Sequence, residues 1–556
     1  MRTCARLHGM RASSLPRSPA PSARGGRRTF ACWLGLAVAL LAVCGCAPRE
    51  PRRVLVVGWD GASYREVDRL LAAGKLPHVE RLLRRGSQAR LESTVIPISS
   101  AAWTSATTGK GPGHTGVYSF FAEKEGGYDV ELISARSNRA APLWRILTAR
   151  GKRSLVFGVP ITYPPEPIAG TLVSGMLSPF RATYTHPPEL VRDLRARGFD
   201  PDLDVWTEAR PVGWDDYAEQ LLLKEEILLE LLETEDWDLA FLVFKSLDVA
   251  SHRALGEDFS AFVEPLYLRL DEILGKLLEA VGPDVDVLLL SDHGFHAYPF
   301  GVNLHTWLLQ QGFSVPKDDV KRFGIRENDP HGLRERQMLL QLRNELDWSR
   351  TRAFADKCEG NFGGIRLNLA GREHEGVVAP EDASRVLDEI EAALRTLTDG
   401  NGRALVTNVW RGADLYPGPH VDVVPDLLFE TLEDCQVFAD PEEPQLLGPY
   451  GELVPDHDRN GILVAAGPSI RSSPERGDAR LVDVAPTVLH LLGQPVYAEM
   501  EGRVLEDWLA LERPVRTLAE ADDPLLSAAP RVHEAPFTEA ELEELAERLG
   551  RLGYSD

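Results

Sequence analysis

Cysteine is scarce in this chain of 556 residues, which holds only six, three of them ahead of Cys46. The body of the chain keeps just Cys358 and Cys435. So few thiols exclude a scaffold held together by several disulfides. Two readings stay open for the remaining pair: one disulfide in an oxidising envelope, or two separate core residues.

Positive charge is also in deficit, since 61 Lys and Arg stand against 84 Asp and Glu and give a formal net charge of -23. Residues 1–45 hold seven Arg and no Asp, Glu or Lys, so the rest of the chain carries about -30. A surface this acidic repels nucleic-acid phosphates, and wrapping of nucleic acid is therefore not expected. Bound divalent cations would locally reverse that repulsion for an anionic ligand.

One apolar run stands out near the N-terminus, from Phe30 to Val43, and basic residues precede it. It has the length of a signal peptide rather than of a membrane span. The following Val43-Cys-Gly-Cys46 resembles a bacterial lipobox. We therefore predict a signal peptide over residues 1–45, lipidation of Cys46 and attachment to a membrane surface of the bacterial cell envelope, on the periplasmic or extracellular face. The alternative is an ordinary secretory signal and a simple secreted protein.

Beyond a polar linker at 46–53, apolar runs of strand length alternate with helical patterns, and no internal repeat is visible. This alternation predicts an α/β domain with a mostly parallel sheet. We place the domain at 54–515. Insertions at about 185–232 and 300–426 interrupt it and are expected to form a cap. A tail at 516–556 ends in an amphipathic pattern, most simply a docking helix.

Two short motifs each place a carboxylate beside an imidazole. Asp248 and His252 stand four residues apart, so on a helical turn they share one face and can ligate one ion. Asp292 and His293 follow the apolar run 285–290, which predicts a buried strand with the pair at its carboxyl end. One such pair alone is more often a solvated helix face. The presence of two favours a site for divalent cations.

Further residues complete the candidate site. Asp60 follows an apolar run and precedes Gly61, so we expect it at the carboxyl end of another strand, although it could instead cap the next helix. His457 precedes a predicted strand and is a candidate third ligand for an ion held by Asp248 and His252. His420 is a weaker alternative because it has no adjacent partner.

Hydroxyl side chains crowd the segment 92–109, which is followed by a glycine-rich turn. A hydroxyl at the amino end of a helix and beside a divalent cation is a poised nucleophile, because the cation stabilises the alkoxide and backbone N–H groups accept an anion. An ordinary helix start rich in Ser and Thr is the alternative for this segment.

In combination and order, the motifs resemble the alkaline phosphatase superfamily and, within it, the type I phosphodiesterase/nucleotide pyrophosphatase branch. The resemblance spans about Val54 to Leu505. The matching segments are Gly58–Gly61, Pro97–Ser105, Asp248–His252, Ser291–Gly294 and Val482–Gly493.

The resemblance implies a three-layer α/β/α sandwich with two metal positions. Zinc is the expected ion, and manganese is the alternative. One position would use Asp248, His252 and His457, and the other Asp60, Asp292 and His293. Counting back from the motif's tryptophan aligns the nucleophile with Ser99, and Ser100 is its local rival.

Some positions depart from the family pattern. Ser119 stands where relatives commonly have Asn or Asp, so one contact to the substrate is altered. The residues after Ser99 lack the Pro and Arg that sulfatases of the superfamily need, which excludes a sulfatase. Lys110 and Lys245 are the candidate cations near the motifs, and Lys245 is the better placed of the two because it precedes Asp248 by three residues.

We therefore expect a hydrolase of small phosphoesters that uses two metal ions and forms a covalent phosphoryl group on Ser99. Diesters or pyrophosphates are the expected substrates. A phosphomonoesterase, a transferase of the phospho group, and a catalytically inactive binding protein are the alternatives, and the last is disfavoured because all six metal positions are filled. No motif identifies the leaving group or the oligomeric state.

Overall fold

The structure is a computed structural model that describes residues 52–123, 127–128, 130–201, 214–252, 254, 258–317, 343–441, 443, 445–528, 537–538 and 541. The predicted signal peptide and Cys46 lie outside these residues. Among the helices described, none is both long enough and apolar enough to cross a membrane.

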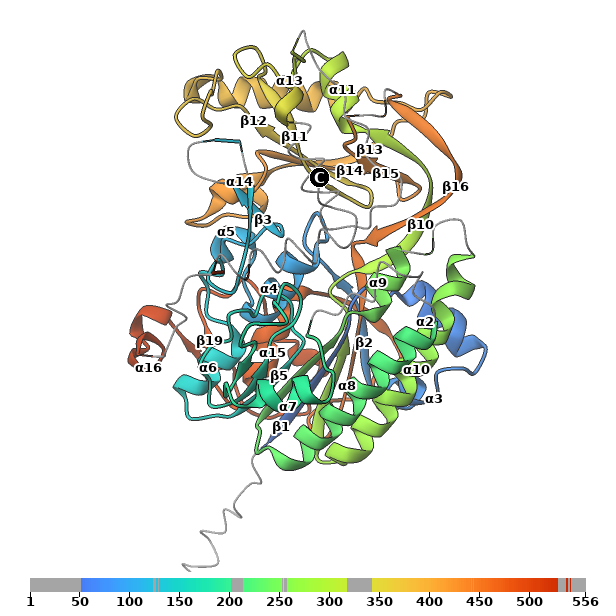
Figure 1. Cartoon of the computed structure of the whole chain (residues 1–556), viewed down its shortest axis with the longest axis vertical. Coiled ribbons are helices and arrows are strands. Elements are labelled where there is room, and N and C mark those ends of the chain that lie inside the picture. The colour runs from blue at the N-terminus through green and yellow to red at the C-terminus, as the bar shows by residue number, and fades with distance from the viewer. Residues whose placement is uncertain are drawn as a thin grey trace, which may run out of the picture. The chain divides into compact units, whose positions relative to one another are not determined.

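A nine-stranded sheet forms the centre of the fold (Figure 1). Its strands, in spatial order, are β18 (Arg476–Arg480), β2 (Gly86–Glu92), β17 (Asn460–Ala466), β9 (Val285–Leu290), β1 (Arg53–Trp59), β8 (Leu239–Phe244), β5 (Ser154–Phe157), β6 (Gly170–Val173) and β7 (Thr185–His186). Neighbours run parallel except at β17, which is antiparallel to β2 and β9, and at the edge strand β7. The mostly parallel sheet predicted from the sequence is confirmed.

Helices cover both faces of this sheet, because successive side chains of a strand point to opposite sides. In β1, Leu55 and Val57 lie in one buried cluster, and Val54 and Val56 lie in another. The first cluster packs against α2 (Tyr64–Ala72), α3 (Pro77–Arg85), α7 (Leu190–Ala196), α8 (Trp214–Thr234), α9 (Ser246–His252) and α10 (Phe259–Val281). The second packs against α4 (Ser99–Thr108), α6 (Leu143–Ala149), α15 (Val484–Leu491) and α16 (Pro524–Ser527). The fold is therefore the expected three-layer sandwich.

The segment 185–232, expected as an insertion over the site, instead supplies β7, α7 and most of α8 to the sandwich among its described residues. Leu221, Leu228 and Leu231 of α8 are buried in the first cluster, and α8 lies beside α10 (Figure 1). The apolar spacing of α8 explains its place, because an amphipathic helix buries its apolar face.

Two smaller sheets follow the metal-ligand motif at 292–293. One has the order β15 (Cys435–Phe438), β10 (Gly294–Asn303), β16 (Leu447–Asp458), and the other β11 (Ala353–Glu359), β12 (Phe362–Leu367), β14 (Leu427–Thr431), β13 (Val406–Arg411). With α11 (Leu304–Gln310) and α13 (Ala383–Leu394) they share one buried cluster. We call the described residues of 304–438 the cap region. The predicted insertion at 300–426 makes up most of it.

Shorter elements complete the chain. They are α5 (Pro112–Thr115), β3 (Phe121–Glu123), β4 (Val130–Leu132), α14 (Gly412–Leu415), β19 (Val496–Tyr497) and β20 (Thr517–Leu518). Two long strands join the cap region to the sandwich: β10 begins directly after His293, and β16 ends directly after His457. The positions of both histidines therefore depend on how these strands pair, and Phe295 of β10 lies opposite His457 of β16.

Candidate metal centre and nucleophile

Three carboxylates come from the ends of three neighbouring strands. Asp60 directly follows β1, and one residue separates Asp292 from the end of β9. Asp248 lies in the first turn of α9, which follows β8. These strands are adjacent in the order β9, β1, β8 and run parallel, so their carboxyl ends meet at one edge of the sheet. The backbone N–H of Asp248 donates to the carbonyl of Asp60 at 3.1 Å, which fixes the two loops together.

Ser99 is the first residue of α4 and points toward this edge. Its hydroxyl donates to Asp60 Oδ1 at 3.4 Å and lies 3.2 Å from Nε2 of His293. The hydroxyl of Ser100 is buried and has no hydrogen-bond partner within the described part of the chain. Of the two neighbouring serines, the geometry therefore favours Ser99 as the nucleophile.

Trp103, one turn further along α4, holds Asp60 from the other side. Its indole N–H donates to Asp60 Oδ2 at 2.9 Å. The ring can lie this close because Gly58 has no side chain: a Cβ at that position would come within 2.4 Å of the indole. The motif residues Gly58, Asp60 and Trp103 therefore form one packed unit.

Asp60, Asp292 and His293 form the first group that could hold a metal ion. His293 Nε2 lies 3.5 Å from Asp60 Oδ1 and 3.3 Å from Asp292 Oδ2. The other ring nitrogen, Nδ1, lies 3.0 Å from the carbonyl of Gly294 and can only donate to it. This bond fixes the tautomer, so that the lone pair of Nε2 faces the carboxylates.

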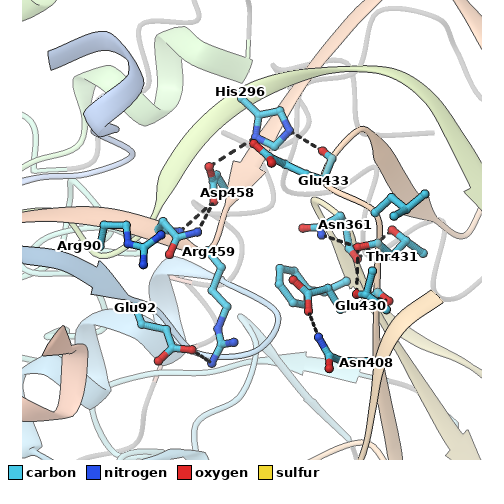
Figure 2. Close-up of a pocket in the computed structure, with 14 residues that line it drawn as sticks. Arg90, Glu92, His296, Asn361, Asn408, Glu430, Thr431, Glu433, Asp458 and Arg459 are labelled. Carbon is cyan, nitrogen blue, oxygen red and sulfur yellow. Dashed lines mark hydrogen bonds and ion pairs between the residues drawn. The ribbon is translucent and has the colours of Figure 1, made fainter. Parts of the chain in front are cut away.

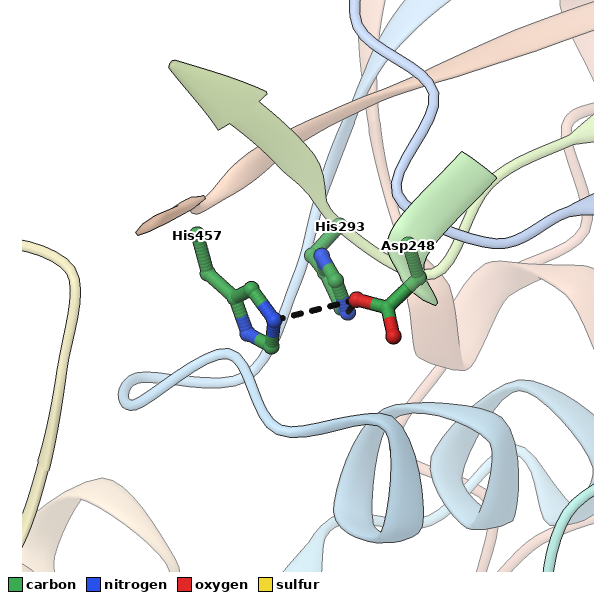
Figure 3. Close-up of side chains that lie close together, drawn as sticks. All are labelled: Asp248, His293 and His457. Atoms are coloured by element: carbon green, nitrogen blue, oxygen red, sulfur yellow. Dashed lines mark hydrogen bonds and ion pairs between the residues drawn. The ribbon is translucent and has the colours of Figure 1, made fainter. Parts of the chain in front are cut away.

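Asp248, His252 and His457 form the second group. Asp248 Oδ1 lies 3.5 Å from Nε2 of His252 and 3.1 Å from Nε2 of His457, and the two Nε2 atoms are 2.9 Å apart. His457 donates from Nδ1 to the carbonyl of Pro97 at 2.7 Å, which directs its Nε2 to Asp248 (Figure 3). Two imidazole nitrogens and a carboxylate oxygen thus converge on one point, as ligands of a single ion do.

The two groups adjoin each other. His293 Nε2 is 3.9 Å from Asp248 Oδ1, and the rings of His293 and His457 are stacked with centroids 3.8 Å apart (Figure 3). Phe295 forms an apolar wall, with its ring centroid 4.7 Å from that of His252 and 5.1 Å from that of His457. The site is therefore a single buried cluster in which water is largely excluded.

Burial and mutual repulsion shift the pKa values of this cluster. Burial, with the charges of the neighbouring carboxylates, raises the pKa of Asp60 well above its usual value, and burial raises the pKa of Asp292 to about 7. Burial lowers the pKa of His293 to about 3. Burial also acts against the charge on Asp248, but the imidazoles of His252 and His457 outweigh it and hold the pKa of that carboxyl well below its usual value.

Divalent cations fit this set of donors. Without them, carboxylates at one point of a water-poor site must take up protons, whereas a divalent charge stabilises all of them in the ionised form. Mixed imidazole nitrogens and carboxylate oxygens in groups of three are ligands of zinc that leave a coordination position open. The structure thus brings together all six residues that the sequence proposed as ligands. Asp60, Asp292 and His293 converge as proposed, and Asp248 and His457 converge with His293 as well as with His252, so the division of the six between two ions stays a prediction.

Other candidates have different surroundings. Ser119 is buried, and its hydroxyl accepts from the backbone N–H of Phe121 at 3.2 Å. Lys110 pairs with Glu520 at 2.6 Å, so it does not serve as the substrate cation considered from the sequence. Lys245 lies where β8 meets α9. His420 donates its backbone N–H to Gly113 and belongs to none of the metal-ligand groups in the described residues.

The two body cysteines are both free thiols in the structure. Cys358 is the next-to-last residue of β11, and Cys435 is the first residue of β15. Burial raises the pKa of each thiol, to about 12 for Cys435, so neither is an activated nucleophile.

Sequence reasoning missed several residues around the site. Phe295 stands two residues after His293, and its apolar type beside a ligand was the available signal. Pro97 acts through its carbonyl, which no sequence pattern reveals. Asp456 and Glu359 reach the site only through the pairing of distant strands.

A polar cavity of about 500 Å³ lies next to the cluster on the strand β16 (Figure 2). Asp458 lines this cavity and directly follows His457 in β16. Because successive side chains of a strand point to opposite faces, His457 does not line the cavity. Two ion pairs form within its lining: Arg459 with Glu92 at 2.8 Å, and Asp458 with His296 at 3.6 Å. None of the predicted metal ligands lines this cavity.

Fold and cluster together define an α/β protein with buried groups of carboxylates and imidazoles that could hold metal ions. Comparison with known families is more specific. A family model described as type I phosphodiesterase / nucleotide pyrophosphatase matches residues 54–461. The match covers most of the chain, so the chain belongs to this family, within the alkaline phosphatase superfamily. Membership places it among hydrolases of phosphoesters, a family that generally uses divalent metal ions.

Solved structures share the fold. Phosphonoacetate hydrolase from Sinorhizobium meliloti, in complex with phosphonoformate, is 14% identical, with a TM-score of 0.52, and the match covers 80% of this chain and 95% of that one. An inactive form of murine ectonucleotide pyrophosphatase / phosphodiesterase 5, in complex with AMP, is 13% identical, with a TM-score of 0.50 and coverage of 83% and 100%. No curated protein matches the chain by sequence.

We predict that metal uptake depends steeply on pH. In the metal-free protein Asp292, with its pKa raised to about 7, keeps its proton below that pH, and an ion must displace it. Apparent affinity for Zn²⁺ should therefore fall between pH 8 and pH 6, by at most about tenfold per pH unit for each displaced proton. Calorimetric titration in two buffers of different ionisation enthalpy measures both affinity and proton release.

A matched pair of variants isolates this effect. Asp292→Asn should flatten the pH dependence, whereas Asp458→Asn, which alters a nearby carboxylate outside the cluster, should leave it as in the unaltered protein. An affinity that does not change between pH 6 and pH 8 would contradict the assignment of Asp292.

Proposed function

We propose that the protein hydrolyses phosphodiesters or pyrophosphate-linked substrates through a covalent phosphoryl group on Ser99. The observation that carries this proposal is the place of the Ser99 hydroxyl, which contacts Asp60 and His293 at the edge of a buried cluster that contains the six predicted metal ligands. A serine alone at a helix start has no means of activation, and this one contacts two of the three residues proposed for one ion position.

The proposed reaction has two displacements. The Ser99 oxygen bonds to phosphorus as the bond to the leaving oxygen breaks, and the hydroxyl proton ends on the leaving group. Water then attacks phosphorus and displaces Ser99: the hydroxyl of the water stays on phosphorus, which gives a phosphomonoester product from a diester, and the other proton restores the Ser99 hydroxyl. Two divalent ions, when bound, lower the pKa of the nucleophile and offset the negative charge of the transferred group.

Several residues of the chain prepare this chemistry. Trp103 holds Asp60 by a hydrogen bond, so that the carboxylate keeps its orientation beside Ser99. Phe295 and its neighbours exclude water from the imidazoles, which strengthens electrostatic interactions inside the cluster. The backbone N–H groups at the start of α4 face the same edge and favour an anion there.

The nucleophile can be tested by a pair of adjacent substitutions. Ser99→Ala should lower kcat by roughly 10³-fold or more while metal content stays close to that of the unaltered protein, because the hydroxyl supplies covalent catalysis. Ser100→Ala is the matched control and should keep most of the activity. Steady-state kinetics and elemental analysis of the same samples measure both effects. Loss of activity in Ser100→Ala, with activity kept in Ser99→Ala, would assign the nucleophile to Ser100.

Two observations support diesters over monoesters. Efficient use of a monoester needs an added cation for its extra negative charge. Lys110 is paired with Glu520 and so does not supply that charge. The phosphodiesterase family to which the chain belongs favours the same conclusion.

A second candidate, a phosphomonoesterase, is favoured by one observation in the cap region. Lys357 of β11 is almost fully buried, and its ammonium lies 5.8 Å from the ring centre of Phe121, two residues after Ser119. Burial lowers the pKa of Lys357 to about 8, so the group still carries its charge at neutral pH. An ammonium beside the Ser119 turn is suited to a terminal phosphate.

Kinetics with matched substrates separates the two candidates. We expect kcat/KM for a nitrophenyl nucleoside diester to exceed that for nitrophenyl phosphate at identical metal loading. A monoester preference of tenfold or more, worth about 1.4 kcal/mol, would contradict the first candidate. Lys357→Met and Lys245→Ala would then show which ammonium supplies the preference, with Lys110→Met as the control for loss of a buried lysine.

We also propose that the protein is a lipoprotein of the bacterial cell envelope, anchored through Cys46. This rests on the sequence pattern Val43-Cys-Gly-Cys46 after an apolar run. Stable anchoring takes two or more acyl chains, which modification of a processed N-terminal cysteine provides.

The anchor has a direct test. Mass spectrometry of the mature protein from membranes should identify an N-terminus at acylated Cys46, and Cys46→Ala should move the protein to the soluble fraction. An unmodified terminus elsewhere would reduce the protein to a simple secreted enzyme.

A further inference from the structure

The tight turn between β11 and β12, residues 359–361, lies directly against the metal-ligand strand β16. The backbone N–H of Gly360 donates to Asp456 Oδ2 at 3.0 Å. Glu359 Oε1 lies 3.5 Å from Nδ1 of His457. Gly360 has φ +57, and a Cβ there would lie 2.2 Å from the carbonyl oxygen of His457. The turn and the ligand are therefore in contact through backbone as well as side chains.

Asp456 connects the turn to His457. Its Oδ1 accepts the backbone N–H of His457 at 2.7 Å, and its Oδ2 accepts from both Gly360 and the side chain of Gln436. Tyr450 in turn donates to Gln436 at 2.7 Å. Asp456 lies near His252 and His457, but its oxygens are already occupied by three N–H donors. We therefore assign it to positioning rather than to metal binding.

The remaining polar groups of His457 are also fixed. Its carbonyl accepts the hydroxyl of Tyr298 at 2.7 Å, and its Nδ1 donates to Pro97 at 2.7 Å. Backbone N–H, carbonyl and Nδ1 thus each have a partner, and Nε2 is left to face Asp248 and His252. Partners of this kind orient a ligating imidazole, and their loss typically weakens metal binding by about 10- to 100-fold.

The turn is itself anchored in the cap region. Asn361 donates from its side chain to the carbonyl of Thr431 at 3.0 Å, and its own carbonyl accepts the backbone N–H of Thr431 at 2.8 Å. Thr431 ends β14 of the four-stranded sheet. Asn361 and Thr431 also line the polar cavity beside β16 (Figure 2), so the turn separates that cavity from His457.

We propose that the turn 359–361 is a positioning element of the cap region that sets the affinity of one metal position, the one formed by Asp248, His252 and His457. This inference rests on the proposed function, since it assumes that the cluster binds metal. It assigns to the cap region a role in building the metal centre, in addition to covering substrate.

Two left-handed glycines of the cap region provide the test. Gly360→Ala places a methyl group against His457, whereas Gly371→Ala meets nothing within 4 Å, and both positions have positive φ, +57 and +85. Backbone strain is thus similar in the two variants, and only one displaces the ligand. Competition with a chelator gives the Zn²⁺ affinity of each position, and circular dichroism checks the fold.

We expect Gly360→Ala to bind one of two ions about 10- to 100-fold more weakly and to regain activity with excess Zn²⁺. Gly371→Ala should match the unaltered protein. If Gly360→Ala does not fold, Gln436→Leu, which releases Asp456 from the other side, should weaken the same position. The visible spectrum of the Co²⁺-loaded variants should change in parallel, because the ligand geometry changes.

The outcomes separate this inference from the proposed function. If the unaltered protein binds no transition metal, the proposed function itself fails. If it binds two ions and folded Gly360→Ala and Gln436→Leu bind both with unchanged affinity and spectrum, only the positioning role of the turn is overturned.

Discussion

The mutual repulsion of buried carboxylates is the constraint on which this structure depends. Asp60, Asp248 and Asp292 lie within one water-poor cluster, and burial raises the pKa of two of them. A protein gains nothing from such an arrangement in a purely structural role, because protonated or repelling carboxyls lower stability. Divalent cations reverse the sign of the interaction. The cluster is therefore best understood as a site whose charge is completed by metal ions.

The fold meets this constraint through the ends of parallel strands. Three adjacent strands deliver three carboxylates to one edge, and α4 brings Ser99 to the same edge. Among the three histidine ligands, His457 lies on β16, a strand that follows the cap region. The centre is thus built from a rigid sandwich and from a second group of strands, and the hydrogen bonds around Asp456 join the two.

Much of this could be predicted from sequence, because the signals are local. The strand at 285–290 was expected from an apolar run and has those bounds in the structure. Asp248 and His252 share a helix face as their spacing indicates. The features that sequence reasoning missed depend on contacts between residues far apart in the chain. The place of 185–232 in the sandwich depends on which surface α8 buries, and the roles of Pro97, Glu359 and Gly360 arise where distant strands meet, which a single sequence does not encode in any motif.

The central claim, that one cluster holds two metal ions, is tested most directly by crystals of the Zn²⁺-loaded protein with anomalous scattering, combined with elemental analysis of the same preparation. We expect close to two ions per chain, one bound by Asp60, Asp292 and His293 and the other by Asp248, His252 and His457. Full activity with no transition metal, or with a single ion bound elsewhere, would contradict it.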